Sequence, residues 1–177
     1  GTVDFTSVTL PDSITILQVG SGAILTYSQF DALDSVKLRD GAVSGDGKLT
    51  IAMNVEQFGK LDTSKVEDVT VEELVRDTAE NILAATSLAG ADAVTVSGGD
   101  AGTLSIADYT ALTSLTSDDS FAYAIQDSAE NLLANGAAEP LTSAGAVTVS
   151  GGDAGTLSMA DYTALTSLTS DDSFAYA

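Results

Sequence analysis

The chain has 177 residues, 44% of them apolar, which is enough length and apolar content to bury a core. Its charge is unusual, because 26 Asp and Glu residues face six Lys and Arg residues, giving a net charge of −20 and an isoelectric point near 4.1. Such a surface repels nucleic acid and attracts cations, Ca²⁺ above all. We therefore expect no nucleic-acid binding and, since no run of 18 apolar residues occurs, no membrane insertion.

The missing residue types limit the chemistry. The chain has no His and no Cys, so the commonest general base, the thiolate nucleophile and most zinc ligands are absent. A carboxylate-dependent glycoside hydrolase stays open as an alternative, although the aromatic residues that usually line a sugar pocket make up only 6% of the chain. We predict that the chain is not an enzyme and has no catalytic residues.

A long internal repeat dominates the sequence. Residues 93–124 return as residues 146–177 at an offset of 53 residues, with Ile106 replaced by Met159 as the one change. Packing alone would tolerate far more drift than this, so the near-identity indicates a recent tandem duplication. Repeat arrays grow in this way far more often than enzymes do.

Helix-start signals reveal older copies. Ser, Thr or Asn stands three residues before an acid or amide, which is typical of an N-cap, and an aromatic at +4 and a Leu at +7 share one helical face. Four segments fit this pattern: Thr26–Gln29 with Phe30 and Leu33, Asn54–Gln57 with Phe58 and Leu61, Ser105–Asp108 with Tyr109 and Leu112, and Ser158–Asp161 with Tyr162 and Leu165. A second box alternates with the first and makes Asp77 and Asp127 the expected N-caps of two further helices.

Short strand-like runs lie between the helix starts. Those expected are 14–17, 48–53, 93–97, 121–125 and 146–150. Each 53-residue unit then contains strand, helix, strand and helix, which favours parallel pairing. We predict an α/β fold of tandem strand-helix repeats stacked as a short solenoid-like domain, with all-β sandwich repeats as the alternative. The expected divisions are a degenerate region at 1–53, repeats at 54–104 and 105–157, and a truncated repeat at 158–177.

The segments Asp-Ser/Thr-Ala-Glu-Asn-Leu/Ile-Leu-Ala and Val-Thr-Val-Ser-Gly, followed by a short capped helix, carry a resemblance. Over residues 54–177, and less clearly 12–53, the chain resembles the repeats of large secreted bacterial surface proteins. These are exported by type I systems, often beside RTX calcium repeats, and serve as adhesins or surface-layer proteins. The resemblance implies an extracellular or cell-surface location. The RTX nonapeptide itself is absent, since Gly98-Gly99-Asp100-Ala101-Gly102 departs from Gly-Gly-x-Gly-x-Asp.

Several acidic turns are candidate Ca²⁺ sites, because Ca²⁺ prefers carboxylate and carbonyl oxygens. They are the Gly-Gly-Asp turns with Asp100 and Asp153, and the paired acids Asp118, Asp119, Asp171 and Asp172. Simple solvated turns are the alternative for both kinds. Residues 44–49 have the Asp-Gly centre of an EF-hand loop, but Ala42 and Met53 stand where its first and last ligands belong, so a β-turn is expected there.

Two functions fit these features best. The first is a structural region that self-assembles as surface-layer or matrix material, and the second is a stalk or binding module of a large calcium-dependent adhesin. The aromatic residues at the +4 positions are expected in the core, with a sugar-binding platform as the alternative. The last strand, Phe174–Ala177, has no helix after it. We expect the apolar face of this strand to be covered by a neighbouring repeat of a longer array or by a neighbouring subunit.

Overall fold

The computed structural model describes residues 1–42, 47–118, 120–136, 138–170 and 174–176. The backbone groups into two compact units. The first unit comprises Gly1–Asp77 and Ala85–Thr95, and the second comprises Thr78–Ala84 and Val96–Ala177. Six helices and parallel sheets are found in the described part of the chain, so the fold is α/β, as predicted, and an all-β sandwich is not seen. None of the helices in these ranges is long and apolar enough to cross a membrane.

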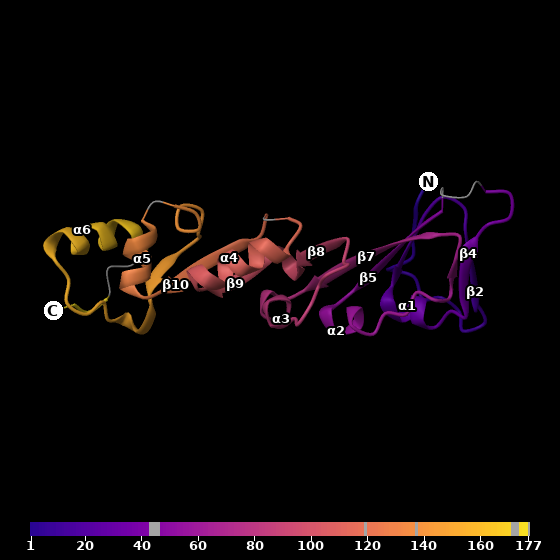
Figure 1. The fold of residues 1–177 in the computed structure, drawn as a ribbon, viewed down its shortest axis with the longest axis horizontal. Coiled ribbons are helices and arrows are strands. Elements are labelled where there is room, and N and C mark those ends of the chain that lie inside the picture. Colours follow the sequence, from indigo (N-terminus) through magenta and orange to yellow (C-terminus); the bar gives the residue numbers. More distant parts are fainter. Residues whose placement is uncertain (43–46, 119, 137, 171–173, 177) are drawn as a thin grey trace. The chain divides into compact units, whose positions relative to one another are not determined.

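The described residues of the first unit form two sheets, and Figure 1 shows several of their strands. The larger has the strand order β1 (Val3–Asp4), β3 (Ala23–Thr26), β5 (Lys48–Met53), β7 (Thr70–Asp77) and β8 (Ala93–Val96). The smaller has the order β2 (Ile16–Val19), β4 (Ser35–Leu38) and β6 (Val66–Glu67). Within both, the strands whose register is defined are paired in parallel. The strand expected at 14–17 is β2, which begins two residues later than predicted. The strand expected at 48–53 is β5, and its bounds are confirmed.

Alternating residues of the central strands form the core of the first unit. Leu49, Ile51 and Met53 of β5 are buried while the residues between them are half-buried, which is the period of two that a strand imposes. Leu25 of β3 and Val75 of β7 flank them and are fully buried. Each such side chain contributes roughly 1.5–3 kcal/mol by leaving water.

Two short helices follow these strands directly. In α1 (Tyr27–Asp31) and α2 (Val55–Phe58), Thr26 and Asn54 form the predicted reciprocal capping boxes with Gln29 and Gln57. Both helices end before the Leu at +7, so Leu33 and Leu61 lie in the turn that follows and not on the helix, contrary to the prediction. Phe30 and Leu33 are nevertheless buried.

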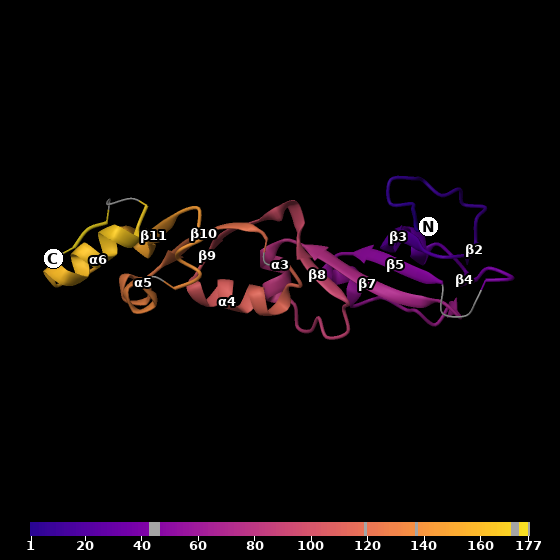
Figure 2. The ribbon, with the colours of Figure 1, turned by 90° about the horizontal axis from the view of Figure 1, so that it is seen from above.

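The described residues of the second unit form a three-stranded parallel sheet and four helices, which Figure 2 labels. The strand order is β11 (Val147–Val149), β10 (Ala122–Asp127), β9 (Asp100–Leu104), and the helices are α3 (Ala79–Ala84), α4 (Ile106–Leu115), α5 (Ala129–Asn135) and α6 (Met159–Leu168). The helices expected after Ser105 and Ser158 are confirmed, as are strands near 93–97, 121–125 and 146–150. Phe121, Tyr123 and Ile125 face inward along the β10 segment, as its alternation predicted.

A Ser-Gly-Gly turn redirects strand pairing in each copy. Before the turn at Ser150–Gly152, β11 pairs with β10, and after it Asp153 bridges to Ala175. The earlier turn, Ser97–Gly99, likewise separates β8, in the first unit's sheet, from β9, which pairs with β10. Both glycines of each turn have φ between 68° and 77°, a region that residues with a side chain rarely adopt. The Gly-Gly pair is therefore a structural requirement of the turn.

Candidate functional site

The aspartates of the Gly-Gly-Asp turns use their side chains locally. An Oδ1 atom of Asp100 accepts a hydrogen bond from the backbone N–H of Gly102 at 2.8 Å, and Asp153 does the same with Gly155 at 2.8 Å. Both aspartates are exposed. This arrangement stabilises the turn, which is the alternative that the sequence left open.

The paired acids are described only in part. Asp118 accepts a hydrogen bond from the backbone N–H of Ser120 at 2.9 Å, and hydrogen bonds from the Ser120 side chain and backbone lower the pKa of Asp118 below its usual value. Asp119, Asp171 and Asp172 lie outside the described residues, as do residues 43–46 of the Asp-Gly turn. No group of three or more acidic side chains that could hold a metal is found in the described ranges. Calcium binding stays a prediction.

The two aspartates predicted as N-caps have a different role. Ser128 is the N-cap of α5 and accepts a hydrogen bond from the N–H of Asn131, so the prediction for Asp127 was wrong by one residue. For α3, the hydroxyl of Thr78 accepts from the N–H of Asn81, which corrects Asp77 in the same way.

Each of these aspartates instead binds the start of the helix in the preceding strand-helix segment. An Oδ2 atom of Asp127 accepts from the N–H of Ile106, the first residue of α4, at 2.9 Å. Within the first unit, Asp77 accepts in the same way from Val55, the first residue of α2, at 3.0 Å. The amide at this helix position has no partner inside its own helix, so the aspartate satisfies it. The structure thus repeats one link between successive strand-helix segments.

Asp127 is well placed to stay ionised. Its burial acts to raise the pKa, but hydrogen bonds from the Asn131 side chain and from the backbone N–H groups of Ile106 and Ser128 lower it, and the pKa lies below its usual value. Asn131 belongs to the Ala-Glu-Asn-Ile/Leu motif, which reads Ala79–Ile82 before β8 and Ala129–Leu132 before β11. Asn131 therefore supports the link that Asp127 makes between segments.

Aromatic rings gather where α4 meets β10. The ring of Tyr109 lies 4.6 Å from that of Tyr123 and 6.3 Å from that of Phe121, measured between centroids. The hydroxyl of Tyr123 donates to the backbone carbonyl of Pro140 at 3.0 Å and lies 3.2 Å from a carboxylate oxygen of Glu139. Burial, with Tyr109 and Glu139 nearby, raises the pKa of Tyr123. The +4 aromatic Tyr109 is therefore half-buried in a cluster, as Tyr162 is in the second copy.

The second copy repeats this cluster. Tyr162 lies 4.6 Å from Tyr176 and 6.2 Å from Phe174 between ring centroids, close to the values of the first copy. The residues that bind the Tyr123 hydroxyl, Glu139 and Pro140, come from a segment after α5 that the sequence pattern had not singled out. The cis peptide bond between Glu139 and Pro140 gives no sequence signal beyond the Pro itself.

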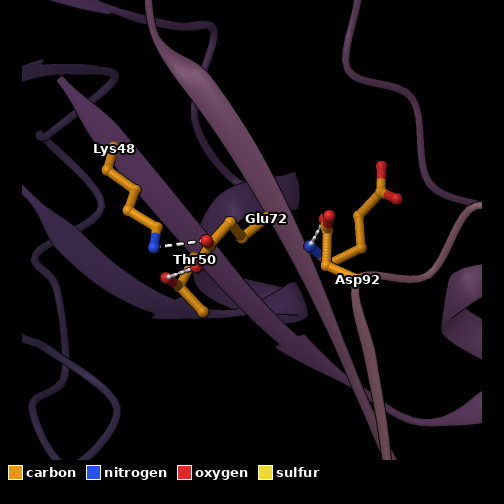
Figure 3. A network of polar contacts seen from close by, with 5 residues as sticks. Lys48, Thr50, Glu72 and Asp92 are labelled. Atoms are coloured by element: carbon orange, nitrogen blue, oxygen red, sulfur yellow. Dashed lines mark hydrogen bonds and ion pairs between the residues drawn. The ribbon is translucent and has the colours of Figure 1, made fainter. Parts of the chain in front are cut away.

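A polar network joins β5, β7 and the residue before β8 in the first unit (Figure 3). Lys48 forms an ion pair with Glu72 on the neighbouring strand, and the Thr50 hydroxyl lies 3.3 Å from the same carboxylate. Asp92 accepts from the N–H of Glu73 at 2.9 Å and its own N–H donates to the Glu73 carbonyl at 3.1 Å. Burial, followed by the charge of Asp92, raises the pKa of Glu73. These contacts hold neighbouring strands of the first unit together.

Two hollows on the described surface are lined by few ionisable side chains. One of about 540 Å³ in the second unit is lined by α3, β9 and α4 and includes the carboxylates of Glu80 and Asp108. The Asp108 carboxylate accepts a hydrogen bond from the Ser105 hydroxyl at 2.8 Å at the start of α4. Another, of about 420 Å³ in the first unit, is lined by residues 8–12, Ile14 and residues of α1 and the turn after it, and Asp12 is the one acidic residue in this lining.

A scan against protein-family models, a search of curated proteins and a search of solved structures each found no match to this chain.

Proposed function

We propose that this chain is a non-enzymatic structural repeat region of an extracellular bacterial surface protein. Its strand-helix segments stack on one another as a short solenoid, and the protein self-assembles as surface-layer or matrix material. The duplicated module of residues 93–124 and 146–177 is the observation that carries the proposal, because its strand, turn, helix and aromatic cluster recur in both copies. A structure built by stacking gains from such duplication, whereas an active site does not.

The link between segments supports stacking. Asp77 and Asp127 each bind the helix start of the preceding strand-helix segment, within the first and the second unit respectively. Because the same contact recurs between successive segments, a further segment can be added with the same kind of contact. Ca²⁺ is the cofactor that we propose for this acidic surface, at Asp100, Asp153 and the Asp-Asp turns, since bound cations relieve the repulsion of 26 acidic side chains.

Two measurements test the proposal. First, a variant that carries one more copy of residues 93–145 is unfolded in urea. If segments stack, the free energy of unfolding rises with the added copy, because each copy adds an interface to its neighbour. An independent extra domain would instead leave the original transition where it was.

The second measurement concerns assembly. Negative-stain electron microscopy and sedimentation of the purified chain, with and without Ca²⁺, are expected to show lattices or filaments. Particles that stay monomeric at every concentration and Ca²⁺ level would favour the adhesin stalk over self-assembling material. Hydrolysis of a glycan that is lost in a Glu80→Gln variant would contradict both.

A further inference from the structure

The two copies of the repeat differ sharply in exposure at two positions. Ile106, at the start of α4, is 9% exposed, whereas Met159, at the same position of α6, is 80% exposed. Tyr123 is 7% exposed, whereas its counterpart Tyr176 is 56% exposed. Other paired positions match closely: Phe121 and Phe174 are both 7% exposed, and Leu112 and Leu165 are both fully buried. The difference is therefore local to one face of the module.

These positions form one continuous surface. In the first copy, Ile106 and Tyr109 are three residues apart on α4 and so share a helix face, and the Tyr109 ring packs on Tyr123. Met159 and Tyr162 stand in the same relation on α6, and the Tyr162 ring packs on Tyr176. We call Met159 and Tyr176 the open face.

The first copy shows what covers this surface. Hydrogen bonds to this surface come from residues 125–149: Asp127 accepts from the backbone N–H of Ile106, and the Tyr123 hydroxyl donates to Glu139 and Pro140. The backbone N–H of Gly145 donates to the Tyr123 carbonyl at 2.8 Å, after which β11 pairs in parallel with β10. We call residues 125–149 the covering segment.

We propose that the open face is the docking site for the covering segment of a further repeat unit. This inference rests on the proposed stacking of segments and names the residues that perform it. The occupant presents an Asp at the start of α6, a Glu-Pro pair at the Tyr176 hydroxyl and a Val-Thr-Val strand. The 32-residue identity of the two modules makes the open face chemically equivalent to a surface that already binds this segment, apart from Met159 in place of Ile106.

The test uses the two methionines of the chain as reporters. A second copy of residues 125–149 is appended directly after Ala177, and the rates of sulfoxide formation in dilute hydrogen peroxide are followed by mass spectrometry. Met159 is expected to oxidise about fivefold or more slowly in the extended chain, in line with the fall from 80% to 9% exposure between the two positions. Met53, which is 4% exposed, is the internal control and keeps its slow rate in both chains.

Matched extensions identify the contacts. A scrambled extension of the same composition is expected to give no protection. An extension whose Asp at the position of Asp127 is changed to Ala is expected to leave the amide of Met159 in faster hydrogen exchange than the unaltered extension does. The proposal is supported if the unaltered extension slows the oxidation of Met159 and the scrambled extension does not.

Two results would overturn it. One is rapid oxidation of Met159 although circular dichroism shows that the extension has folded. The other is protection of Met159 that grows with the concentration of the unextended chain, which would make a second copy of the chain the occupant. Either result leaves the urea experiment on an added copy free to succeed, so failure of this docking site is distinguishable from failure of the proposed function.

Discussion

The carboxylate of Asp127 binds the backbone amide of Ile106 across 21 positions of sequence, and Asp77 binds that of Val55 across 22. In each pair the aspartate ends a strand and the amide begins the helix of the preceding strand-helix segment. A side chain thus satisfies a helix end that is remote in sequence, which couples the position of one segment to the next.

Replacement of Asp127 by Ala is expected to lower the free energy of unfolding by about 1–3 kcal/mol. The change removes three hydrogen bonds to an ionised group and leaves the amide of Ile106 without its acceptor. Glu130→Ala is the matched control, because it removes the same charge from an exposed position in the first turn of α5. Urea unfolding of both variants makes the comparison, and equal losses would show that only charge matters.

The same carboxylate predicts a pH dependence. The pKa of Asp127 is lowered in the folded chain, so the fold binds its proton less tightly than the unfolded chain does. Its contribution to stability is therefore complete above the usual pKa of 3.8 and is lost as the pH falls through the lowered value. The difference in unfolding free energy between the original chain and Asp127→Ala should shrink in acid. A difference that is constant between pH 7 and pH 2 would contradict this role.

Tyr123→Phe is expected to cost about 1 kcal/mol of unfolding free energy, because it removes the buried hydroxyl that Pro140 and Glu139 bind. Tyr176→Phe is the paired control at the equivalent position of the second copy. There the side chain is 56% exposed and water can serve the hydroxyl, so a change of less than about 0.5 kcal/mol is expected. Chemical denaturation of the two variants under one buffer gives the contrast. Similar losses at both positions would show that the hydroxyl bonds of Tyr123 add nothing.

Local sequence signals predicted the elements well and their connections poorly. Ser105 and Ser158 cap the expected helices because a cap depends on residues three apart, and Phe121, Tyr123 and Ile125 point inward because a strand alternates sides. Asp127 was misassigned because Asp and Ser both make good N-caps and stand next to each other. Its true partner, Ile106, is set by strand pairing. The role of Glu139 and Pro140 depends in the same way on contacts that no local pattern encodes.

The ion pair between Lys48 and Glu72 is expected to contribute less than about 1 kcal/mol, since both side chains remain partly exposed. A double-mutant cycle with Lys48→Met and Glu72→Gln measures their coupling, and the coupling should fall as NaCl is raised. The ion pair between Glu56 and Lys60, which are four residues apart, serves as the comparison because both side chains are well exposed. A coupling energy that does not change with NaCl concentration would indicate that the contact of Thr50 with Glu72 is the stronger interaction.

Calcium is expected to raise the melting temperature of the chain. A net charge of −20 on a folded body repels itself, and a cation that binds the folded form stabilises it by mass action. Melting is measured in EDTA and in millimolar Ca²⁺ at matched ionic strength, with Na⁺ as the screening control. The double variant Asp100→Asn and Asp153→Asn keeps an acceptor oxygen for Gly102 and Gly155 and removes two charges. If the Gly-Gly-Asp turns hold the ion, this variant loses the response to Ca²⁺ while its melting in EDTA changes little. If Ca²⁺ raises the melting temperature of the variant as much as that of the original chain, the ion binds at other carboxylates. If Na⁺ raises the melting temperature equally, the effect is charge screening.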